Sequence, residues 1–525
     1  MVFNRRNFLV SASGLMLLSG LGTHTRLWAA PSFDAYPFSL GVASGDPWPD
    51  GFVIWTRLAP HPLQPDGGMP PLAVAVRWEV AEDEAFLTIV RNGEEIAHPE
   101  LAHSVHVEVG GLQPARHYWY RFHIAGAEAS PVGRVRTAPA AGSSPERLRL
   151  GLAGCQAYPQ GWYDAWRHLS EEPDLDAIFH YGDYIYEYGP ESSFTIRDRE
   201  GRKVNRRHAD NEIYSLTDYR RRYAQYKSDP DLQAAHHATA FIMSFDDHEV
   251  DNNWVSTFDQ DGSPEQAVMA RRIVAMQAWY EHMPVRLAQA PRIGGLTMFR
   301  RLDFGRLVRM HVLDTRSYRS QQLCEKPGAR ACRKQDDPTS TVLGDAQEAW
   351  LGAGLRNDAV WNLIAQQVRM MPIIRRDTDG IRMTDPPDSW SGYPAARARL
   401  VQAIRDNGLT NVVVASGDSH VHNVGYLPLR PGELDGPAAA TEFLGTSISS
   451  GGDGAADSET RRFILQDNPH FALYNQQRGY QLFDITAREW RTDLKVLDKV
   501  QQPGGTLTKL ASFCVLPDQA RLHPA

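Results

Sequence analysis

The sequence predicts a two-part protein in which an all-β domain of the immunoglobulin or fibronectin type precedes a larger α/β domain. The composition is globular, with 525 residues, 42% of them apolar and 22% charged, which is enough for two or more domains. After the N-terminal segment, about a hundred residues alternate between short strands and turns. From there on, buried strand-like runs alternate with longer amphipathic stretches, which is typical of α/β layering.

Residues 1–30 have the features of a cleavable export signal. Arg5 and Arg6 precede a modest apolar run that contains glycines and ends in small residues. The paired arginines with Phe8 behind them resemble the twin-arginine consensus, so we expect the twin-arginine export machinery as a partner and a periplasmic or secreted location. The alternative is a membrane anchor, but the run is short and glycine-interrupted. No later run reaches the ~18 apolar residues of a stable membrane span.

The net charge and the number of cysteines exclude some classes of protein. With 63 acidic and 55 basic side chains the net charge is −8, which argues against nucleic-acid recognition. Four cysteines in an exported chain fit no disulfide framework. Cys324 and Cys332 bracket a basic loop, and whether they form a disulfide depends on geometry that a sequence does not supply.

The all-β domain is predicted to span residues 36–138. Residues 111–121 resemble the loop and strand that carry a tyrosine corner in immunoglobulin-like sandwiches. A linker rich in proline, glycine and serine follows, and the second domain is predicted to span residues 146–525. Strands of the first domain are expected at residues 51–57, 74–80 and 104–109.

Five apolar runs in the second domain each end in side chains with binding chemistry. In open α/β sheets, ligands bind outside the carboxyl ends of the strands. Oxygen donors favour calcium, magnesium, manganese or ferric iron, and thiolate and phenolate add a preference for iron. The side chains are Cys155 after residues 148–154, Asp183 and Tyr186 after 177–182, Asp247 and His248 after 239–245, Gln366 and Gln367 after 361–365, and Asp418 and His420 after 411–417.

Four blocks at these positions carry a resemblance. They are Gly-Asp-Tyr-Ile-Tyr at 182–186, Asp-Asp-His-Glu at 246–249, Leu-Asp-Thr-Arg at 313–316 and Gly-Asp-Ser-His at 417–420. Together with the twin-arginine segment and the β-domain, they resemble the PhoD-type alkaline phosphatases. These are calcineurin-like metallophosphoesterases related to purple acid phosphatases. The resemblance implies an α/β metallophosphoesterase sandwich of two mixed sheets flanked by helices.

The resemblance also implies ferric iron and calcium as cofactors, with one aspartate shared between them. Carboxylates stand where related enzymes use nitrogen ligands, a change that suits a hard, oxygen-seeking cation such as calcium. The implied iron ligands are Cys155, Tyr186 and His420, the shared ligand is Asp183, and the calcium ligands are Asp247 and Asp418.

Further polar residues near these blocks are candidates for contacts to the substrate. His248 is a candidate to contact phosphate or assist the leaving group, or else a structural histidine. Asn252 is a candidate donor to a phosphate oxygen. Arg316 and Arg319 form either salt bridges within the fold or phosphate contacts. The arginines at 220–222 are expected on a helix over residues 216–227, either on its solvated face or where they help to attract an anionic substrate.

The predicted function is hydrolysis of phosphate esters by a metal-bound hydroxide, as an exported alkaline phosphatase with phosphodiesterase activity. The sequence has no Gly-x-Ser-x-Gly block, so a serine nucleophile is not expected. One alternative is a phospholipase D-like phosphodiesterase of the same superfamily. Another, of a different class, is a binding protein whose metal site is purely structural.

Overall fold

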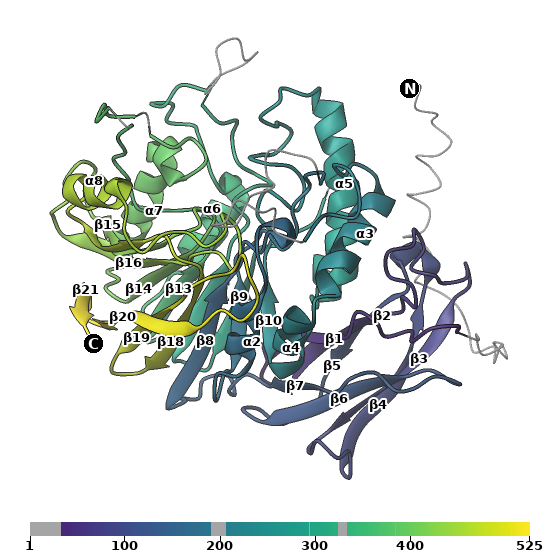
Figure 1. The fold of residues 1–525 in the computed structure, drawn as a ribbon. Coiled ribbons are helices and arrows are strands. Elements are labelled where there is room, and N and C mark those ends of the chain that lie inside the picture. The colour runs from purple at the N-terminus through teal and green to yellow at the C-terminus, as the bar shows by residue number, and fades with distance from the viewer. Residues whose placement is uncertain (1–32, 191–205, 293–294, 324–332, 378, 384) are drawn as a thin grey trace.

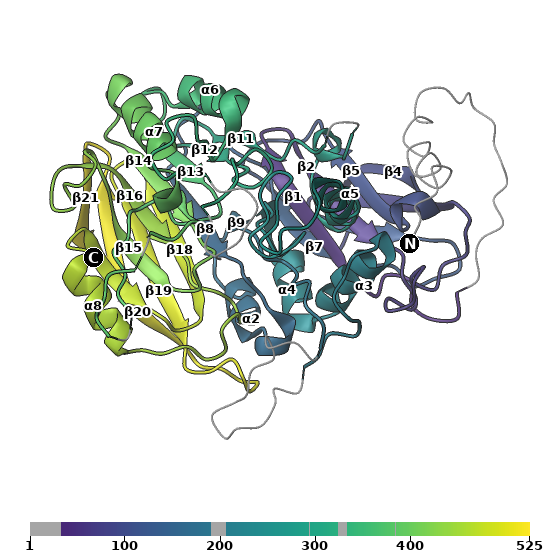
Figure 2. The same cartoon turned by 90° about the horizontal axis from the view of Figure 1, so that it is seen from above.

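The structure is a computed structural model that describes residues 33–190, 206–292, 295–323, 333–377, 379–383 and 385–525. Two large sheets lie side by side at its centre, and helices cover their outer faces (Figures 1 and 2). The predicted signal segment 1–30 and both Cys324 and Cys332 lie outside the described residues. Within the described ranges, no helix is long and apolar enough to cross a membrane.

The first large sheet has ten strands. At its centre β8, β9 and β10 run parallel and are almost entirely buried, as the apolar runs predicted. In spatial order the strands are β21 (Gln519–Pro524), β20 (Leu507–Leu516), β19 (Trp490–Leu497), β18 (Gly479–Thr486), β8 (Arg147–Ala153), β9 (Ala177–His180), β10 (Ala240–Met243), β1 (Val42–Trp48), β2 (Gly51–Arg57) and β5 (Ser104–Val109).

The second large sheet has seven strands, and β12, β13, β14 and β16 are its parallel core. In spatial order the strands are β11 (Arg300–Phe304), β12 (Val308–Val312), β13 (Trp361–Ala365), β14 (Val412–Ser416), β16 (Ala438–Leu444), β15 (His422–Pro428) and β17 (Phe471–Asn475). The two sheets pack through aromatic contacts: Trp361 meets Trp490 with ring centroids 5.7 Å apart, and Phe443 meets Phe483 at 5.7 Å. This arrangement confirms the predicted pair of mixed sheets.

Helices α2 to α5 lie on the side of the ten-stranded sheet, and α6 and α7 on that of the seven-stranded sheet (Figure 2). The α-helices are α2 (Asp164–Ser170), α3 (Leu216–Lys227), α4 (Pro230–Ala238), α5 (Glu265–His282), α6 (Gly344–Gly354), α7 (Pro394–Asp406) and α8 (Glu459–Asp467). The 3₁₀ helices are η2 (Pro99–Leu101), η3 (Tyr158–Gln160), η4 (Leu287–Gln289) and η5 (Trp390–Gly392).

Helix α3 spans the predicted residues because Ser215 and Asp218 form a capping box at its start. The expectation of a solvated arginine face on α3 was wrong for Arg222, which is buried. Its guanidinium donates hydrogen bonds to the backbone carbonyls of Tyr186 and Tyr188. A buried guanidinium is tolerated here because loop carbonyls satisfy its donors.

The N-terminal strands lie in two layers. Four of them form a separate sheet in the order β4 (Ile89–Ala97), β3 (Val74–Ala81), β6 (His117–His123) and β7 (Gly133–Arg136). The other three, β1, β2 and β5, continue the ten-stranded sheet through the parallel pairing of Gly45 with Phe241. The Tyr118 hydroxyl accepts a hydrogen bond from the Gln113 backbone N–H at 2.9 Å, the contact expected of a tyrosine corner. The immunoglobulin-like assignment and the domain boundaries stay predictions.

Candidate metal centre

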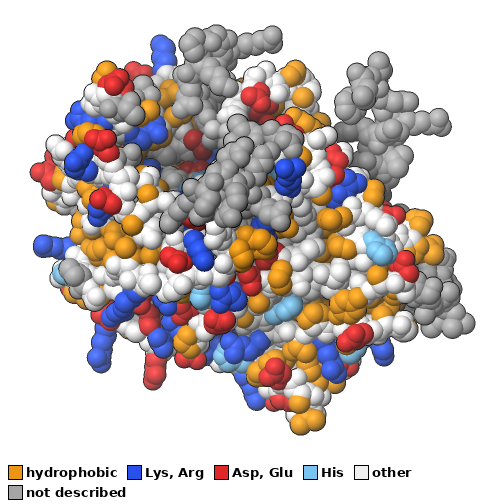
Figure 3. Space-filling model, viewed as in Figure 1, with side chains coloured by type: hydrophobic (Ala, Val, Ile, Leu, Met, Phe, Trp, Pro, Cys, Tyr) orange, Lys and Arg blue, Asp and Glu red, His pale blue; other side chains and the backbone are white. Residues whose placement is uncertain are grey.

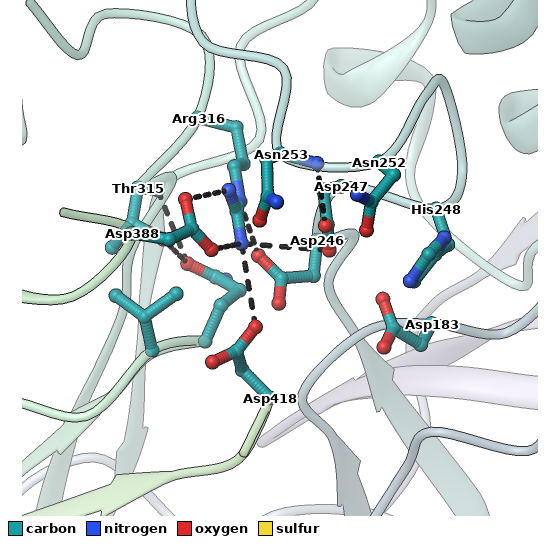
Figure 4. Close-up of polar contacts among 12 residues, drawn as sticks. Asp183, Asp246, Asp247, His248, Asn252, Asn253, Thr315, Arg316, Asp388 and Asp418 are labelled. Carbon is teal, nitrogen blue, oxygen red and sulfur yellow. Dashed lines mark hydrogen bonds and ion pairs between the residues drawn. The ribbon is translucent and has the colours of Figure 1, made fainter. Parts of the chain in front are cut away.

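The candidate site lies where the carboxyl ends of parallel strands from both sheets meet, as Figure 4 shows for part of it. Three parallel strands of one sheet and one strand of the other converge there, so side chains far apart in sequence become neighbours. The face above these strand ends is hollowed, and acidic side chains line its depth (Figure 3). The strands deliver Cys155 (β8), Asp183 and Tyr186 (β9), Asp246, Asp247 and His248 (β10), and Asp418 and His420 (β14).

One group of donors combines sulfur, oxygen and nitrogen. Ligand atoms of Cys155, Asp183 and His420 lie within 4.8 Å of one another. The Tyr186 hydroxyl donates to Asp183 Oδ2 at 2.9 Å and lies 3.1 Å from His420 Nε2. Donor atoms about 3 Å apart can both reach one ion at about 2.1 Å. Thiolate, phenolate, imidazole and carboxylate together suit ferric iron.

Asp183 also belongs to a second group. Its carboxylate, that of Asp247 and the ring of His248 have ligand atoms within 4.8 Å of one another. Burial raises the pKa of Asp183 to about 7. Both Asp183 Oδ1 and Asp247 Oδ1 are buried and accept no hydrogen bond from the described residues. Carboxylate oxygens buried without a hydrogen bond are costly, and a bound cation would satisfy both, so the residues present fit a metal at this position.

A third group is a set of carboxylates around one arginine. Asp246, Asp247 and Asp418 have oxygens within 4.8 Å of one another. Arg316, whose side chain is fully buried, contacts Asp246 through Nε and lies 3.4 Å from Asp247 and 3.6 Å from Asp418 (Figure 4). Its two terminal nitrogens also hold Asp388, at 2.7 and 3.0 Å. Arg319 also contacts Asp388, at 3.0 Å, so two guanidiniums face four carboxylates, which leaves an excess of acidic oxygen, the ligand type that calcium prefers.

Of the two residues predicted to act on substrate, His248 lies against the metal ligands. Its Nδ1 pairs with Glu187 Oε2 at 2.7 Å, and its ring packs on the Tyr186 ring with centroids 4.0 Å apart. Burial alone would lower the pKa of His248, but the carboxylates of Glu187 and Asp247 outweigh it and hold this pKa well above its usual range. The geometry therefore presents a fixed imidazole beside the carboxylate groups.

Asn252, the second of these residues, makes hydrogen bonds to residues other than the predicted metal ligands. Its backbone N–H donates to Glu187 at 2.9 Å, and its side-chain amide donates to Gln260 at 2.7 Å. The neighbouring Asn253 contacts the carboxylates instead, because its backbone N–H donates to Asp247 Oδ2 at 2.8 Å. Sequence analysis missed Asn253, although it follows Asn252 in the same block.

The backbone is left-handed at four of the candidate ligands. The φ angles are 53° at Cys155, 54° at Asp183, 66° at Asp418 and 55° at His420. Such angles are uncommon outside glycine and cost energy, and they gather at functional sites. Gly182 makes the turn before Asp183 possible, because its φ is 132° and a Cβ there would lie 2.4 Å from Asp246 Cβ.

Glu249 holds two of these strand ends together. Its fully buried carboxylate accepts hydrogen bonds from the backbone N–H groups of Asp183, Tyr184 and Asp246, at 2.5 to 3.2 Å. Three backbone donors that would otherwise be unsatisfied thereby converge on one side chain. The carboxyl ends of β9 and β10 are fixed relative to each other as a result.

Comparisons with known proteins agree on one family. The family model of the PhoD-like phosphatases matches residues 150–494, and the model of the N-terminal domain of PhoD-like phosphatases matches residues 23–139. The chain belongs to the PhoD-like phosphatase family. Alkaline phosphatase D of Bacillus subtilis (strain 168) is 42% identical over 531 residues, which is 99% of this chain and 89% of that protein. The solved structure of PhoD superposes with a TM-score of 0.89 at 43% identity and covers 94% of this chain and 93% of that one.

Membership confirms the resemblance and the fold class predicted from the sequence. In this PhoD-like phosphatase the six predicted metal ligands lie in one connected cluster of donors. Sequence analysis left out Asp246, although it stands beside Asp247 in the Asp-Asp-His-Glu block. For Arg316 the structure shows salt bridges within the fold, which was one of its two interpretations. Sequence analysis did not name Asp388 or Glu187 as site residues, and each acts by holding another side chain.

Proposed function

We propose that this PhoD-like phosphatase is an exported, metal-dependent enzyme that hydrolyses phosphate monoesters and diesters. The observation that carries the proposal is the overlap of the three donor groups, which share Asp183 and Asp247. A chain of shared carboxylates is suited to holding adjacent cations, and adjacent cations stabilise both oxygens of an in-line displacement at phosphorus. A purely structural site would not need such shared, incompletely bonded oxygens.

Ferric iron would be held by Cys155, Asp183, Tyr186 and His420, and calcium by Asp247 and Asp418, with Asp183 shared between them. When bound, these metals supply Lewis acidity toward phosphoryl oxygens and a water of lowered pKa.

Other residues of the chain orient the side chains that would contact the metals and the substrate. Ser450 donates a hydrogen bond to the Tyr186 hydroxyl at 2.7 Å, which orients the phenol toward Asp183. Glu187 engages Nδ1 of His248, so hydrogen bonding to a phosphoryl or leaving-group oxygen falls to Nε2. Asn252 is proposed as a weaker contact to phosphate, released from Gln260 when substrate binds.

The test compares p-nitrophenyl phosphate with bis-p-nitrophenyl phosphate on the purified enzyme, together with metal analysis. Asp247→Asn should lower turnover of both by about 10²-fold or more, because a metal ligand is lost. Asp484→Asn is the matched control, since Asp484 pairs with Arg147 at the molecular surface. Full turnover after exhaustive chelation would contradict the proposal.

Export by the twin-arginine route has a separate test. Replacing Arg5 and Arg6 together by lysine should leave uncleaved protein in the cytoplasm. Normal amounts of mature enzyme outside the inner membrane would rule this route out.

A further inference from the structure

A buried loop that is rich in serine contacts the iron ligands of the candidate metal centre. This serine loop comprises residues 447–450, shortly after β16, and the side chains of Ser447, Ser449 and Ser450 are fully buried in it. The backbone N–H groups of Ser449 and Ser450 donate to the Cys155 carbonyl at 3.5 and 3.3 Å. The loop is thereby held against one of the predicted iron ligands.

The hydroxyl of Ser450 lies between two groups of the iron site. Its oxygen is 2.7 Å from the Cys155 carbonyl oxygen and 2.7 Å from the Tyr186 hydroxyl oxygen, and it accepts a hydrogen bond from the Ala157 N–H at 3.1 Å. A serine hydroxyl has one proton to donate, so the two acceptors compete for it. A phenolate is the stronger acceptor, and the Cys155 carbonyl keeps the backbone N–H of Ser450, so iron on Tyr186 would draw the proton to the phenolate oxygen.

Arg478, which directly precedes β18, holds the serine loop in place. Its Nη1 donates to Ser447 Oγ and to the Ser450 carbonyl, both at 2.5 Å, and the Ser447 hydroxyl donates to the same carbonyl at 2.6 Å. Its Nη2 donates to the Gln476 carbonyl. The loop after β16 and the start of β18 are therefore fixed relative to each other, and this fixes Ser450 beside Tyr186.

The charge of Arg478 has no carboxylate partner in the described part of the chain. The residue is 4% exposed, and its hydrogen bonds go to neutral oxygens. Burial lowers the pKa of Arg478 to about 10, and the acidic groups of Tyr181, Cys155 and Tyr186 oppose that. A buried charge without compensation is strongly unfavourable. Thiolate at Cys155 and phenolate at Tyr186, the forms that bind iron, would supply the compensation, and only Ser450 separates them from Arg478 in the chain of hydrogen bonds.

We propose that Arg478 is a positioning residue of the iron site and acts through Ser450. It holds the serine loop so that the Ser450 hydroxyl donates to the oxygen of Tyr186 when iron is bound, and it adds a positive charge near the anionic ligands. This inference rests on the iron of the proposed function. Groups that orient metal ligands through hydrogen bonds change metal affinity by about 10–100-fold, so Arg478 should decide how firmly iron is held.

The experiment records the visible charge-transfer band of the iron-loaded enzyme and the rate at which a hydroxamate chelator removes the iron. In Ser450→Ala the band should move to longer wavelength, because a phenolate without this hydrogen bond donates electron density more easily. Iron loss should be about tenfold faster. Ser449→Ala is the matched control, because Ser449 is equally buried in the same loop and its hydroxyl donates to the Ala157 carbonyl at 3.0 Å instead of to an iron ligand. Its band and its iron loss should match the wild type.

Arg478→Met tests the arginine itself. Its band should move in the same direction as that of Ser450→Ala, and its iron loss should be about tenfold faster or more. If Arg478→Met fails to fold, Ser447→Ala takes its place. That variant loses one hydroxyl, and with it the contact to Arg478 and the hydrogen bond to the Ser450 carbonyl, and its band should move the same way by a smaller amount.

The band position decides the outcome, because a general loss of stability would not move it. An Arg478→Met enzyme, or a Ser447→Ala enzyme in its place, whose band stays at the wild-type wavelength would overturn the proposal. An unmoved band in Ser450→Ala, or a wild type that takes up no ferric iron, would overturn it as well. An iron-loaded wild type that hydrolyses no phosphate ester would refute the proposed function alone, because neither measurement uses a substrate.

Discussion

Replacing Arg316 by methionine tests how the acidic side of the metal centre is held. The Arg316 side chain is fully buried and contacts Asp246 and both oxygens of Asp388. It also lies within 3.6 Å of Asp247 and Asp418. Methionine keeps much of the volume and removes the guanidinium that pairs with Asp246, Asp247 and Asp418.

The expected loss in the free energy of unfolding follows from breaking a buried ion pair. Removing one partner costs about 3–5 kcal/mol, because the other charge stays buried without compensation. Total stabilities are about 5–15 kcal/mol, so the unfolding midpoint of Arg316→Met should fall clearly. Saturating calcium should restore part of the loss, because a bound cation replaces the missing charge among the carboxylates.

The assay is thermal unfolding in chelator and in calcium, with Arg319→Met as the control. Arg319 is equally buried and also contacts Asp388, at 3.0 Å, and no contact joins it to Asp246, Asp247 or Asp418 in the described structure. Its variant should lose the same stability in both conditions. An Arg316→Met protein as stable as the wild type in chelator, or one whose loss is the same with and without calcium, would refute the reasoning.

Three further outcomes are expected. Glu249→Gln should lower both unfolding stability and metal content, because the amide cannot accept all three hydrogen bonds from the backbone N–H groups of Asp183, Tyr184 and Asp246. The control is Glu442→Gln, which weakens hydrogen bonds from the backbone N–H groups of Met370 and Met371 and should leave the iron content unchanged. Tyr186→Phe should bleach a visible charge-transfer band while the fold survives, and a colourless active wild type would exclude ferric phenolate. Burial, and then the charges of Arg309 and Arg301, lower the pKa of His311 from its usual 6.5 to about 3, so the neutral imidazole adds stability above pH 6.5 that is lost as the pH falls toward 3. His311→Leu should therefore flatten the dependence of unfolding stability on pH measured between pH 7 and pH 4. An unchanged slope would contradict this.

The sequence predicted the features that depend on neighbouring residues, which are the helices, the strands and the ligands that follow the strands. Helix α3 begins where Ser215 and Asp218 cap it, and the apolar runs before Cys155, Asp183 and Asp247 became β8, β9 and β10. The predicted ligands converge because the carboxyl ends of parallel strands share one edge of a sheet, so a residue's place after a strand already indicates where it lies. That rule needs no knowledge of contacts between distant segments.

Tertiary structure decided every feature that depends on contacts between segments far apart in the sequence. Asp388 joins the site through its ion pairs with Arg316 and Arg319, and Arg222 is buried because loop carbonyls from outside α3 surround it. The Nε of Arg369 is buried without a hydrogen-bond partner among the described residues, which its neighbours in sequence do not foretell. Pattern and propensity set which segments form strands and helices, whereas the pairing of a buried charge depends on which segments the packed sheets bring together.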